Sequence, residues 1–177
     1  MNDSTISVRY ARALFVSARE KGLVAEVRND MQLLLEMLGE KPFRTMLESP
    51  VLPESKKTDL VSDLLGEHLR ESSLQLLKLT IKNNREAMLG DIARHYEKIF
   101  KQEHGIKSVM ISSAVPVNDT ARSAIVSTIE KTLDTKAEVS SRENSELIGG
   151  FVIRVEDQQY DASVKAQLAA IKKKLLK

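Results

Sequence analysis

The 177 residues are enough for one domain or for two small ones, and the 42% of apolar residues exclude a chain that is disordered throughout. Aromatic residues contribute only 4% and Trp is absent, so the core must be built mainly from aliphatic side chains, a composition that favours helices. The 27 basic and 25 acidic residues are spread along the chain, which argues against a dedicated nucleic-acid-binding protein, because such proteins concentrate basic charge on one surface.

The first half of the sequence is predicted to be a run of helices. Apolar residues at helical spacing mark the segments 4–21, 23–38, 43–47, 71–82 and 85–103. A further helix follows Pro53, whose missing N–H suits a first helical turn. In that helix we expect four buried residues, namely Leu60, Val61, Leu64 and Leu65. Asn83 and Asn84 interrupt the pattern between the last two segments.

The spacing of apolar residues changes at His104-Gly105, where short runs of branched residues begin. The predicted strands cover residues 108–112, 136–140 and 147–155. One helix is predicted to follow an N-cap at Asn118, with an apolar stripe of Ala121, Ile125, Ile129 and Leu133. A closing helix is predicted to follow an N-cap at Asp161, with a stripe of Val164, Leu168, Ile171 and Leu175. We therefore predict an α+β protein with a helical domain over residues 1–104 and a mixed α/β domain over residues 105–177.

No group of side chains points to catalysis. The three histidines, His68, His95 and His104, lie in separate segments without the spacing of a helical metal pair, so we expect no metal site. The pair Gly149-Gly150 leads into an apolar strand, which is unlike a phosphate-binding loop and indicates a close approach of backbone or of a neighbouring helix. The carboxylates have neither apolar surroundings nor a nearby His, so we expect no catalytic residue and no cofactor.

Two helices carry more apolar surface than one edge of a bundle core requires, because a helix at an edge needs one apolar stripe. The first helix has two adjoining faces, one of Val8, Ala11, Phe15 and Ala18, the other of Ile6, Tyr10, Ala13, Leu14 and Ser17. The fifth helix repeats this arrangement, with Leu74, Leu77 and Ile81 on one side and Leu76, Leu79 and Thr80 on the other.

This surplus has two interpretations. Either both helices are central and buried on all sides, or their second faces form a groove for an amphipathic helix of another protein. Small residues in the second set, Ala13, Ser17 and Thr80, would let a visiting backbone come close. Burial of four or five medium-sized apolar side chains gives roughly 6–15 kcal/mol, against an association cost of about 4–15 kcal/mol. One groove alone therefore supports anything from negligible to useful affinity, and a second attachment on the same molecule would strengthen the joint.

Three segments together resemble one protein family. Residues 7–15 (SVRYARALF) are similar to the start of the delta subunit of F-type ATP synthases, the family of the mitochondrial oligomycin sensitivity-conferring protein. Residues 83–85, followed by a long helix and then 112–116 (SSAVP), resemble its domain junction. Residues 147–154 (LIGGFVIR), continuing through 160–164 (YDASV), resemble its C-terminal signature, which is the most specific of the three. Order and spacing agree over essentially the whole chain.

The resemblance implies an N-terminal six-helix bundle, a smaller α/β domain, and a non-catalytic place in the peripheral stalk, the stator of the proton-translocating ATP synthase. It also implies that the bundle binds the N-terminal helix of an alpha subunit between its first and fifth helices, and that the C-terminal domain binds the ends of the b subunits. On this basis the expected partner-binding residues are Tyr10, Ala13, Leu14, Ser17, Leu76, Leu79 and Asn83. Asn84 stands where the family commonly has Gly, and Asn tolerates the left-handed backbone that Gly would supply.

The expected location is the cytoplasmic face of a bacterial inner membrane, reached only through partners. The chain contains no Cys, which excludes disulfides and fits a reducing compartment. Its first residues lack the patterns of a signal peptide and of a transit peptide, and no stretch reaches the roughly 18 apolar residues of a membrane span.

Two alternatives stay open from the residues alone. One is a helical adaptor of another complex that shares only the fold. The other is a nucleic-acid-binding protein that uses the terminal lysines, Lys172, Lys173, Lys174 and Lys177, and it predicts strongly salt-dependent binding. Against the second, these lysines also suit the last turn of a helix, where cations complement the helix dipole.

Overall fold

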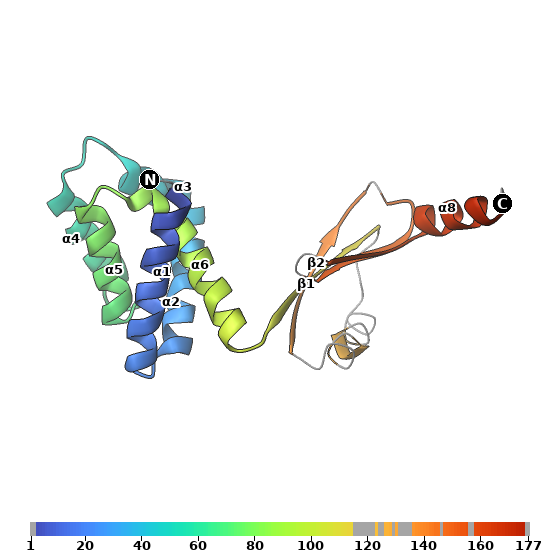
Figure 1. Ribbon diagram of the computed structural model, residues 1–177. Helices are drawn as coiled ribbons and strands as arrows, with labels where there is room; N and C mark the ends of the chain where they lie inside the picture. Colours follow the sequence, from blue (N-terminus) through green and yellow to red (C-terminus); the bar gives the residue numbers. More distant parts are fainter. Residues whose placement is uncertain are drawn as a thin grey trace. The chain divides into compact units, whose positions relative to one another are not determined.

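The computed structural model describes residues 3–114, 123, 126–128, 130, 136–145, 147–155 and 158–175. The chain divides into two compact units, residues 1–100 and 101–177. The first unit is built from helices and the second contains a β-sheet (Figure 1). This arrangement confirms the predicted α+β class.

Six α-helices and a short 3-10 helix make up residues 3–103 (Figure 1). They are α1 (Asp3–Glu20), α2 (Val24–Gly39), α3 (Lys41–Glu48), α4 (Glu54–Leu65), α5 (Glu71–Lys82), η1 (Glu86–Met88) and α6 (Leu89–Glu103). The predicted segments for α1, α2 and α5 agree with these bounds to within about two residues. The segment 85–103 differs, because its first turn is the separate 3-10 helix η1.

The bundle core is aliphatic, with one central aromatic pair. Fully buried residues come from α1, α2, α4, α5 and α6, and they include Ala11, Ala18, Val27, Leu34, Val61, Leu77, Leu89, Ile92 and Tyr96. The Phe15 and Tyr96 rings lie with their centroids 5.6 Å apart in a tilted arrangement. The Tyr96 hydroxyl donates to the Val24 carbonyl oxygen at 3.0 Å, so its polar end is satisfied inside the core.

Polar contacts hold the helices of the bundle in register. The Asp30 carboxylate of α2 accepts hydrogen bonds from the Ser73 hydroxyl at 2.5 Å and from the Arg70 N–H at 2.9 Å, which ties α2 to the start of α5. Arg28 of α2 forms a two-pronged ion pair with Glu97 of α6, at 2.7 and 2.8 Å. The first set of bonds fixes α5 against α2, and the ion pair fixes α6 against α2.

Helix α4 buries one stripe, which corrects part of the prediction. Val61 and Leu65 are buried as expected, but Leu60 and Leu64 are 39% and 51% exposed. The reason is position, because α4 packs against α5 at the edge of the bundle and presents only the stripe that starts at Lys57. Lys57 is itself buried and forms an ion pair with Glu86 of η1.

A tight reversal follows α5. Asn83 ends the helix, and Asn84 has φ of +51°, so the expected left-handed conformation at this asparagine is confirmed. The Asn84 and Arg85 N–H groups donate to the carbonyl oxygens of Ile81 and Thr80, both at 2.9 Å. The reversal thereby satisfies the last turn of α5 and returns the chain toward α1.

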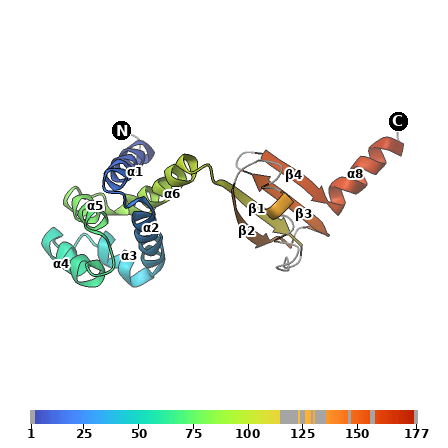
Figure 2. The ribbon, with the colours of Figure 1, turned by 90° about the horizontal axis from the view of Figure 1, so that it is seen from below.

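The second unit contains a mixed four-stranded sheet in the order β2-β1-β3-β4 (Figure 2). Its strands are β1 (Lys107–Ser113), β2 (Ala137–Glu143), β3 (Gly150–Val155) and β4 (Gln158–Ser163), and α8 (Val164–Leu175) follows directly. Strands β1 and β2 are parallel, whereas β3 is antiparallel to both β1 and β4. One face is buried, since Val109 and Ile111 of β1 are 1% and 0% exposed.

The end of the sheet differs from the prediction in three ways. Strand β3 begins at Gly150 rather than at residue 147, and β4 was not predicted. Asp161 lies inside β4, where its carboxylate accepts the Ser163 N–H at 2.9 Å. The cap of α8 is Ser163, whose hydroxyl accepts the Ala166 N–H at 3.2 Å. The prediction of Asp161 as the N-cap was therefore wrong by two residues. Asp and Ser are both good N-cap residues, so residue type alone did not show which of the two begins the helix.

The glycine pair before β3 confirms the predicted close approach. Gly150 has φ of +80°, and a Cβ there would lie 2.5 Å from the Ala162 carbonyl oxygen of β4. A Cβ on Gly149 would lie 3.2 Å from the Val164 side chain. The predicted helix after Asn118 falls outside the described residues, apart from helical residues 123, 126–128 and 130.

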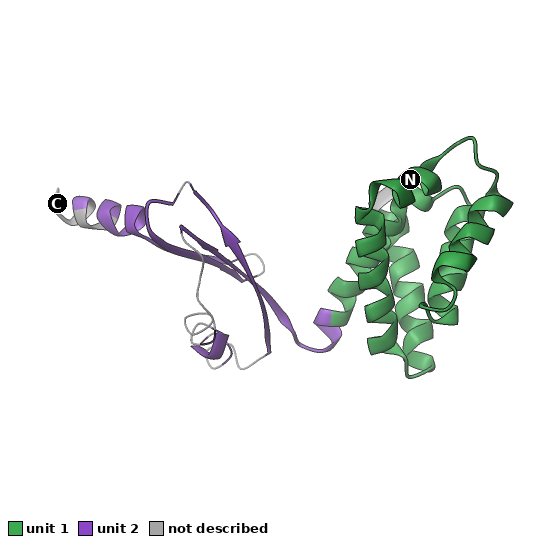
Figure 3. Ribbon diagram, turned by 180° about the vertical axis from the view of Figure 1, so that it is seen from behind, with its two compact units in different colours: residues 1–100 green, residues 101–177 purple. Residues whose placement is uncertain are grey.

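Figure 3 shows the two units in different colours. Their boundary lies within α6, which runs to Glu103, shortly before Gly105, where the sequence pattern changes.

Candidate functional site

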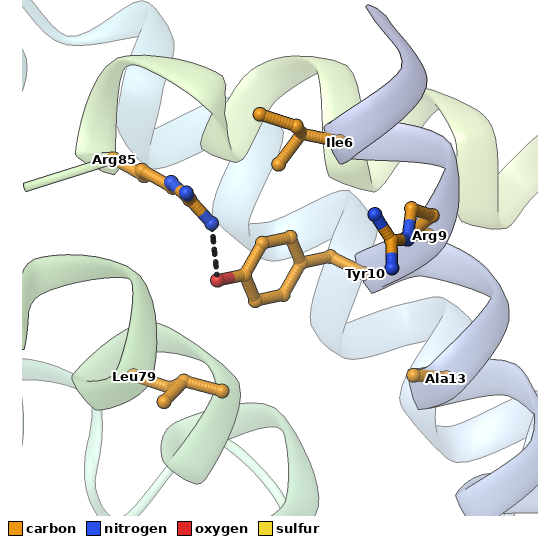
Figure 4. A pocket seen from close by; sticks show the side chains of 6 residues that line it. All are labelled: Ile6, Arg9, Tyr10, Ala13, Leu79 and Arg85. Atoms are coloured by element: carbon orange, nitrogen blue, oxygen red, sulfur yellow. Dashed lines mark hydrogen bonds between the residues drawn. The ribbon is translucent and has the colours of Figure 1, made fainter. Parts of the chain in front are cut away.

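A cleft of about 420 Å³ opens between α1 and α5 (Figure 4). Residues from α1, from α5 and from the segment after α5 line it, namely Ile6, Arg9, Tyr10, Ala13, Leu79 and Arg85. Ile6, Tyr10 and Ala13 share one face of α1, because residues four and seven positions apart lie above one another on a helix. This face adjoins the one that carries Ala11 and Ala18 into the core.

The cleft lining is largely apolar and partly open to solvent. Leu79 projects from α5 and is 46% exposed, so part of its apolar surface is open to a binding partner. Ala13 is exposed on the facing side, and its methyl group leaves room above the helix backbone. The Ile6 side chain closes one end of the cleft and is 8% exposed.

Tyr10 is held by two polar contacts at the rim of the cleft. Its hydroxyl accepts hydrogen bonds from the Asn83 side-chain amide and from the Arg85 guanidinium, both at 3.1 Å. The Arg85 guanidinium also lies 5.9 Å from the centroid of the Tyr10 ring, within cation–π range. Figure 4 shows the Tyr10–Arg85 bond spanning the cleft. Asn83 reaches the hydroxyl from the end of α5, and the left-handed turn at Asn84 brings Arg85 to it.

The rim is cationic. Arg9 and Arg85 both line the cleft, and none of the described residues that line it is acidic. A bound segment with carboxylates on its polar side, or with exposed carbonyl oxygens at a helix C-terminus, would complement these two guanidinium groups.

The structure brings four of the seven expected partner-binding residues together at the cleft. Tyr10, Ala13 and Leu79 line it, and Asn83 bonds to Tyr10. Leu14 and Leu76 belong to the same two helices but are only 5% and 7% exposed. The remaining residue, Ser17, is half-buried on α1, four residues beyond Ala13.

Two lining residues, Arg9 and Arg85, were not foreseen from the sequence. Ile6 was named on the second apolar face of the first helix, although it was left out of the expected partner-binding residues. The position of Arg85 could not be foreseen, because it depends on a backbone reversal that the sequence marked only as a break in helical spacing.

An open apolar cleft between two helices, with a positively charged rim, is typical of a protein-binding module. No helix in the described part of the chain is long and apolar enough to cross a membrane. Within the same residues, no three His, Asp or Glu side chains are grouped so that they could hold a metal ion.

Comparisons with known proteins identify the family. Residues 6–175 match the family described as ATP synthase delta (OSCP) subunit. The ATP synthase subunit delta of Salinibacter ruber is 34% identical over 176 residues, covering 99% of this chain and 93% of that protein. The protein of the same name from Parabacteroides distasonis is 32% identical over 177 residues, covering 99% of this chain and 98% of its own. The chain therefore belongs to the ATP synthase delta (OSCP) subunit family.

A solved structure shares the fold. A chain of the Toxoplasma gondii mitochondrial ATP synthase hexamer aligns with a TM-score of 0.73 at 24% identity, covering 97% of both chains. Membership of the family makes this chain a non-catalytic component of the peripheral stalk of an F-type ATP synthase, the complex that couples ATP synthesis to proton transport. The predicted family and function are confirmed, and they favour a stalk subunit over an adaptor of another complex or a nucleic-acid-binding protein.

Proposed function

We propose that the cleft between α1 and α5 receives the N-terminal helix of the alpha subunit of the same ATP synthase. The observation that carries the proposal is the open apolar lining formed by Tyr10, Ala13 and Leu79. An amphipathic helix seated there covers the exposed Leu79 side chain, and the small side chain at Ala13 lets its backbone come close. The Tyr10 ring, fixed by Asn83 and Arg85, is already oriented, so little side-chain entropy is lost on binding.

The C-terminal domain, residues 105–177, has a separate role in this proposal, which is to bind the ends of the b subunits. Helix α8 presents an apolar stripe that its own unit leaves open, since Val164 and Leu168 are 38% and 59% exposed. These two residues are four positions apart and therefore share one face of the helix. A helical end of a b subunit packed along this stripe would remove it from water.

Two attachments on one chain make a connector. The bundle, residues 1–104, holds the catalytic head through alpha, and the C-terminal domain holds the b subunits that lead to the membrane sector. Once one attachment forms, the other becomes intramolecular, so two moderate affinities combine into a durable joint. In this arrangement the chain sits at the cytoplasmic face of a bacterial inner membrane and reaches the membrane only through its partners.

The substitution Ala13→Asp tests the cleft. It places a carboxylate among apolar side chains, where a bound helix would strip it of water, so the affinity for a synthetic alpha N-terminal peptide should fall at least tenfold. Isothermal titration calorimetry with the full chain measures this. The matched control is Ala169→Asp, which introduces the same charge at an exposed helical alanine of α8 and should leave the affinity unchanged. Equal affinities for wild type and Ala13→Asp would refute the cleft as the binding site.

A further inference from the structure

A buried ion pair in the first unit takes no part in the cleft lining, yet it lies one residue away from it. Lys57 of α4 and Glu86 of η1 form this pair, and their side chains are 8% and 10% exposed. Glu86 directly follows Arg85, which lines the cleft and donates to the Tyr10 hydroxyl (Figure 4). The two consecutive side chains therefore join this segment to two different helices, Arg85 to α1 and Glu86 to α4.

The backbone that carries these two side chains is short and hydrogen-bonded. The Arg85 N–H donates to the Thr80 carbonyl oxygen at 2.9 Å, and the Arg85 carbonyl oxygen accepts the Met88 N–H at 3.0 Å. Each residue of a 3-10 helix advances by about a third of a turn, so neighbouring side chains point in different directions. A displacement of η1 at Glu86 is passed on to Arg85, because the two residues share one planar peptide bond.

The stability of the fold is a poor explanation for burying this pair. Two charges lose their hydration on burial, and their mutual attraction often does no more than offset that loss. One carboxylate oxygen of Glu86 accepts from Lys57, whereas the other is buried and has no hydrogen-bond partner among the described residues. Apolar side chains of similar size would fill the same space without this loss. What the ion pair adds is direction, since a buried charge has to stay beside its partner.

Helix α4 gives the pair a fixed base. It packs along α5, and its buried stripe includes Val61 and Leu65. Lys57 lies four residues before Val61 and so continues the same stripe. On the other side of the pair, η1 contacts α3 and α5 and is followed by the fully buried Leu89. The Lys57 ammonium group therefore reaches η1 from a helix that the core already holds.

We propose that Lys57 and Glu86 are positioning residues for the α1–α5 cleft. Their ion pair sets where η1 lies, and η1 in turn holds the Arg85 guanidinium against the Tyr10 hydroxyl. The Tyr10 ring is thereby kept in the orientation that a bound helix meets. The inference rests on the proposed function and adds to it two residues that lie outside the cleft lining. An apolar replacement of the pair should therefore retain the fold and weaken binding.

Nuclear magnetic resonance of the full chain, without any peptide, tests the positioning itself. The probe is the carbon resonance of Tyr10 Cζ in isotope-labelled protein, and Arg85→Ala shows its value without the guanidinium. The double variant Lys57→Met/Glu86→Leu leaves no unpaired buried charge and should move the resonance toward the Arg85→Ala value. Lys56→Met, at the exposed lysine next in sequence, is the matched control and should leave the resonance in place. A Tyr10 resonance that does not move in the double variant overturns the inference.

Titration calorimetry with a synthetic alpha N-terminal peptide tests the consequence for binding. Arg85→Ala should weaken binding about fivefold in the wild type, but less than about twofold when Lys57→Met/Glu86→Leu is already present. A pair that only stabilises the fold would give the same factor in both backgrounds, which contradicts the inference.

A second variant covers the case in which circular dichroism shows that the double variant does not fold. Glu86→Gln keeps the shape of the side chain and removes its charge, and it should give the same shift of the Tyr10 resonance and the same reduced effect of Arg85→Ala. An unmoved resonance in this variant is equally fatal to the inference. Failure of the wild type to bind the peptide at all refutes the proposed function instead, and the resonance measurement then decides the positioning role by itself.

Discussion

Tyr96 illustrates how single polar groups are accommodated in this aliphatic bundle. Its side chain is fully buried, its ring packs against Phe15, and its hydroxyl donates to the Val24 carbonyl oxygen. Burial raises the pKa of this hydroxyl well above its usual value, and the nearby carboxylates of Asp30 and Glu26 add to the effect because they disfavour a second negative charge. The core therefore accepts this tyrosine only in its neutral form.

The substitution Tyr96→Phe should destabilise the chain by about 1 kcal/mol at pH 8, because the Val24 carbonyl loses its buried donor. The sign of the pH effect follows from the raised pKa. Above about pH 10 the unfolded tyrosine ionises while the folded one stays protonated, so the wild type loses stability as the pH rises. The variant lacks this loss, so the difference in free energy of unfolding between wild type and variant should be smaller at about pH 11 than at pH 8. Urea denaturation at both pH values measures this difference. A difference that does not change with pH would contradict the buried environment assigned to the Tyr96 hydroxyl.

At the scale of elements, hydrophobic spacing was enough to predict most helices but not the last strand. The α1 and α5 bounds follow from apolar residues at helical spacing and from the breaks at Gly22 and Asn83-Asn84. Strand β4 was not predicted, because it is an edge strand of mostly exposed, polar residues, which lack the alternation of a half-buried strand. Leu60 and Leu64 were misplaced because composition does not reveal that α4 lies at the edge of the bundle.

The turn into β3 provides a prediction at this scale. Gly150→Ala should destabilise the second unit by roughly 1–3 kcal/mol, because the positive φ is strained for alanine and the new methyl group would overlap the Ala162 carbonyl oxygen. Gly39→Ala is the matched control, since a methyl group added at the end of helix α2 would meet no atom within 4 Å. Amide exchange of β3 and β4 reports the difference. Equal protection in both variants would show that the close approach does not constrain the sheet.

For the whole molecule, the family and the division into helices followed by a sheet were accessible from the sequence, and the detailed site was accessible in part. The doubled apolar faces of α1 and α5 indicated where a cleft would open, and Tyr10, Ala13 and Leu79 line it. The positive rim was not foreseen, because Arg9 reads as an ordinary surface residue and Arg85 reaches the cleft only through the turn at Asn84. Side chains that depend on tertiary geometry were therefore missed, whereas those set by helical periodicity were found.

The central claim is that a helix of another subunit, the alpha-subunit N-terminus, occupies the α1–α5 cleft. Hydrogen exchange with the full chain tests this claim most directly. Exchange is compared with and without a synthetic peptide of the alpha-subunit N-terminus. We expect added protection in α1 and α5 and in the turn that carries Asn83 and Arg85, because binding holds these elements together. Exchange that is unchanged in α1 and α5, or protection confined to residues 105–177, would contradict the account.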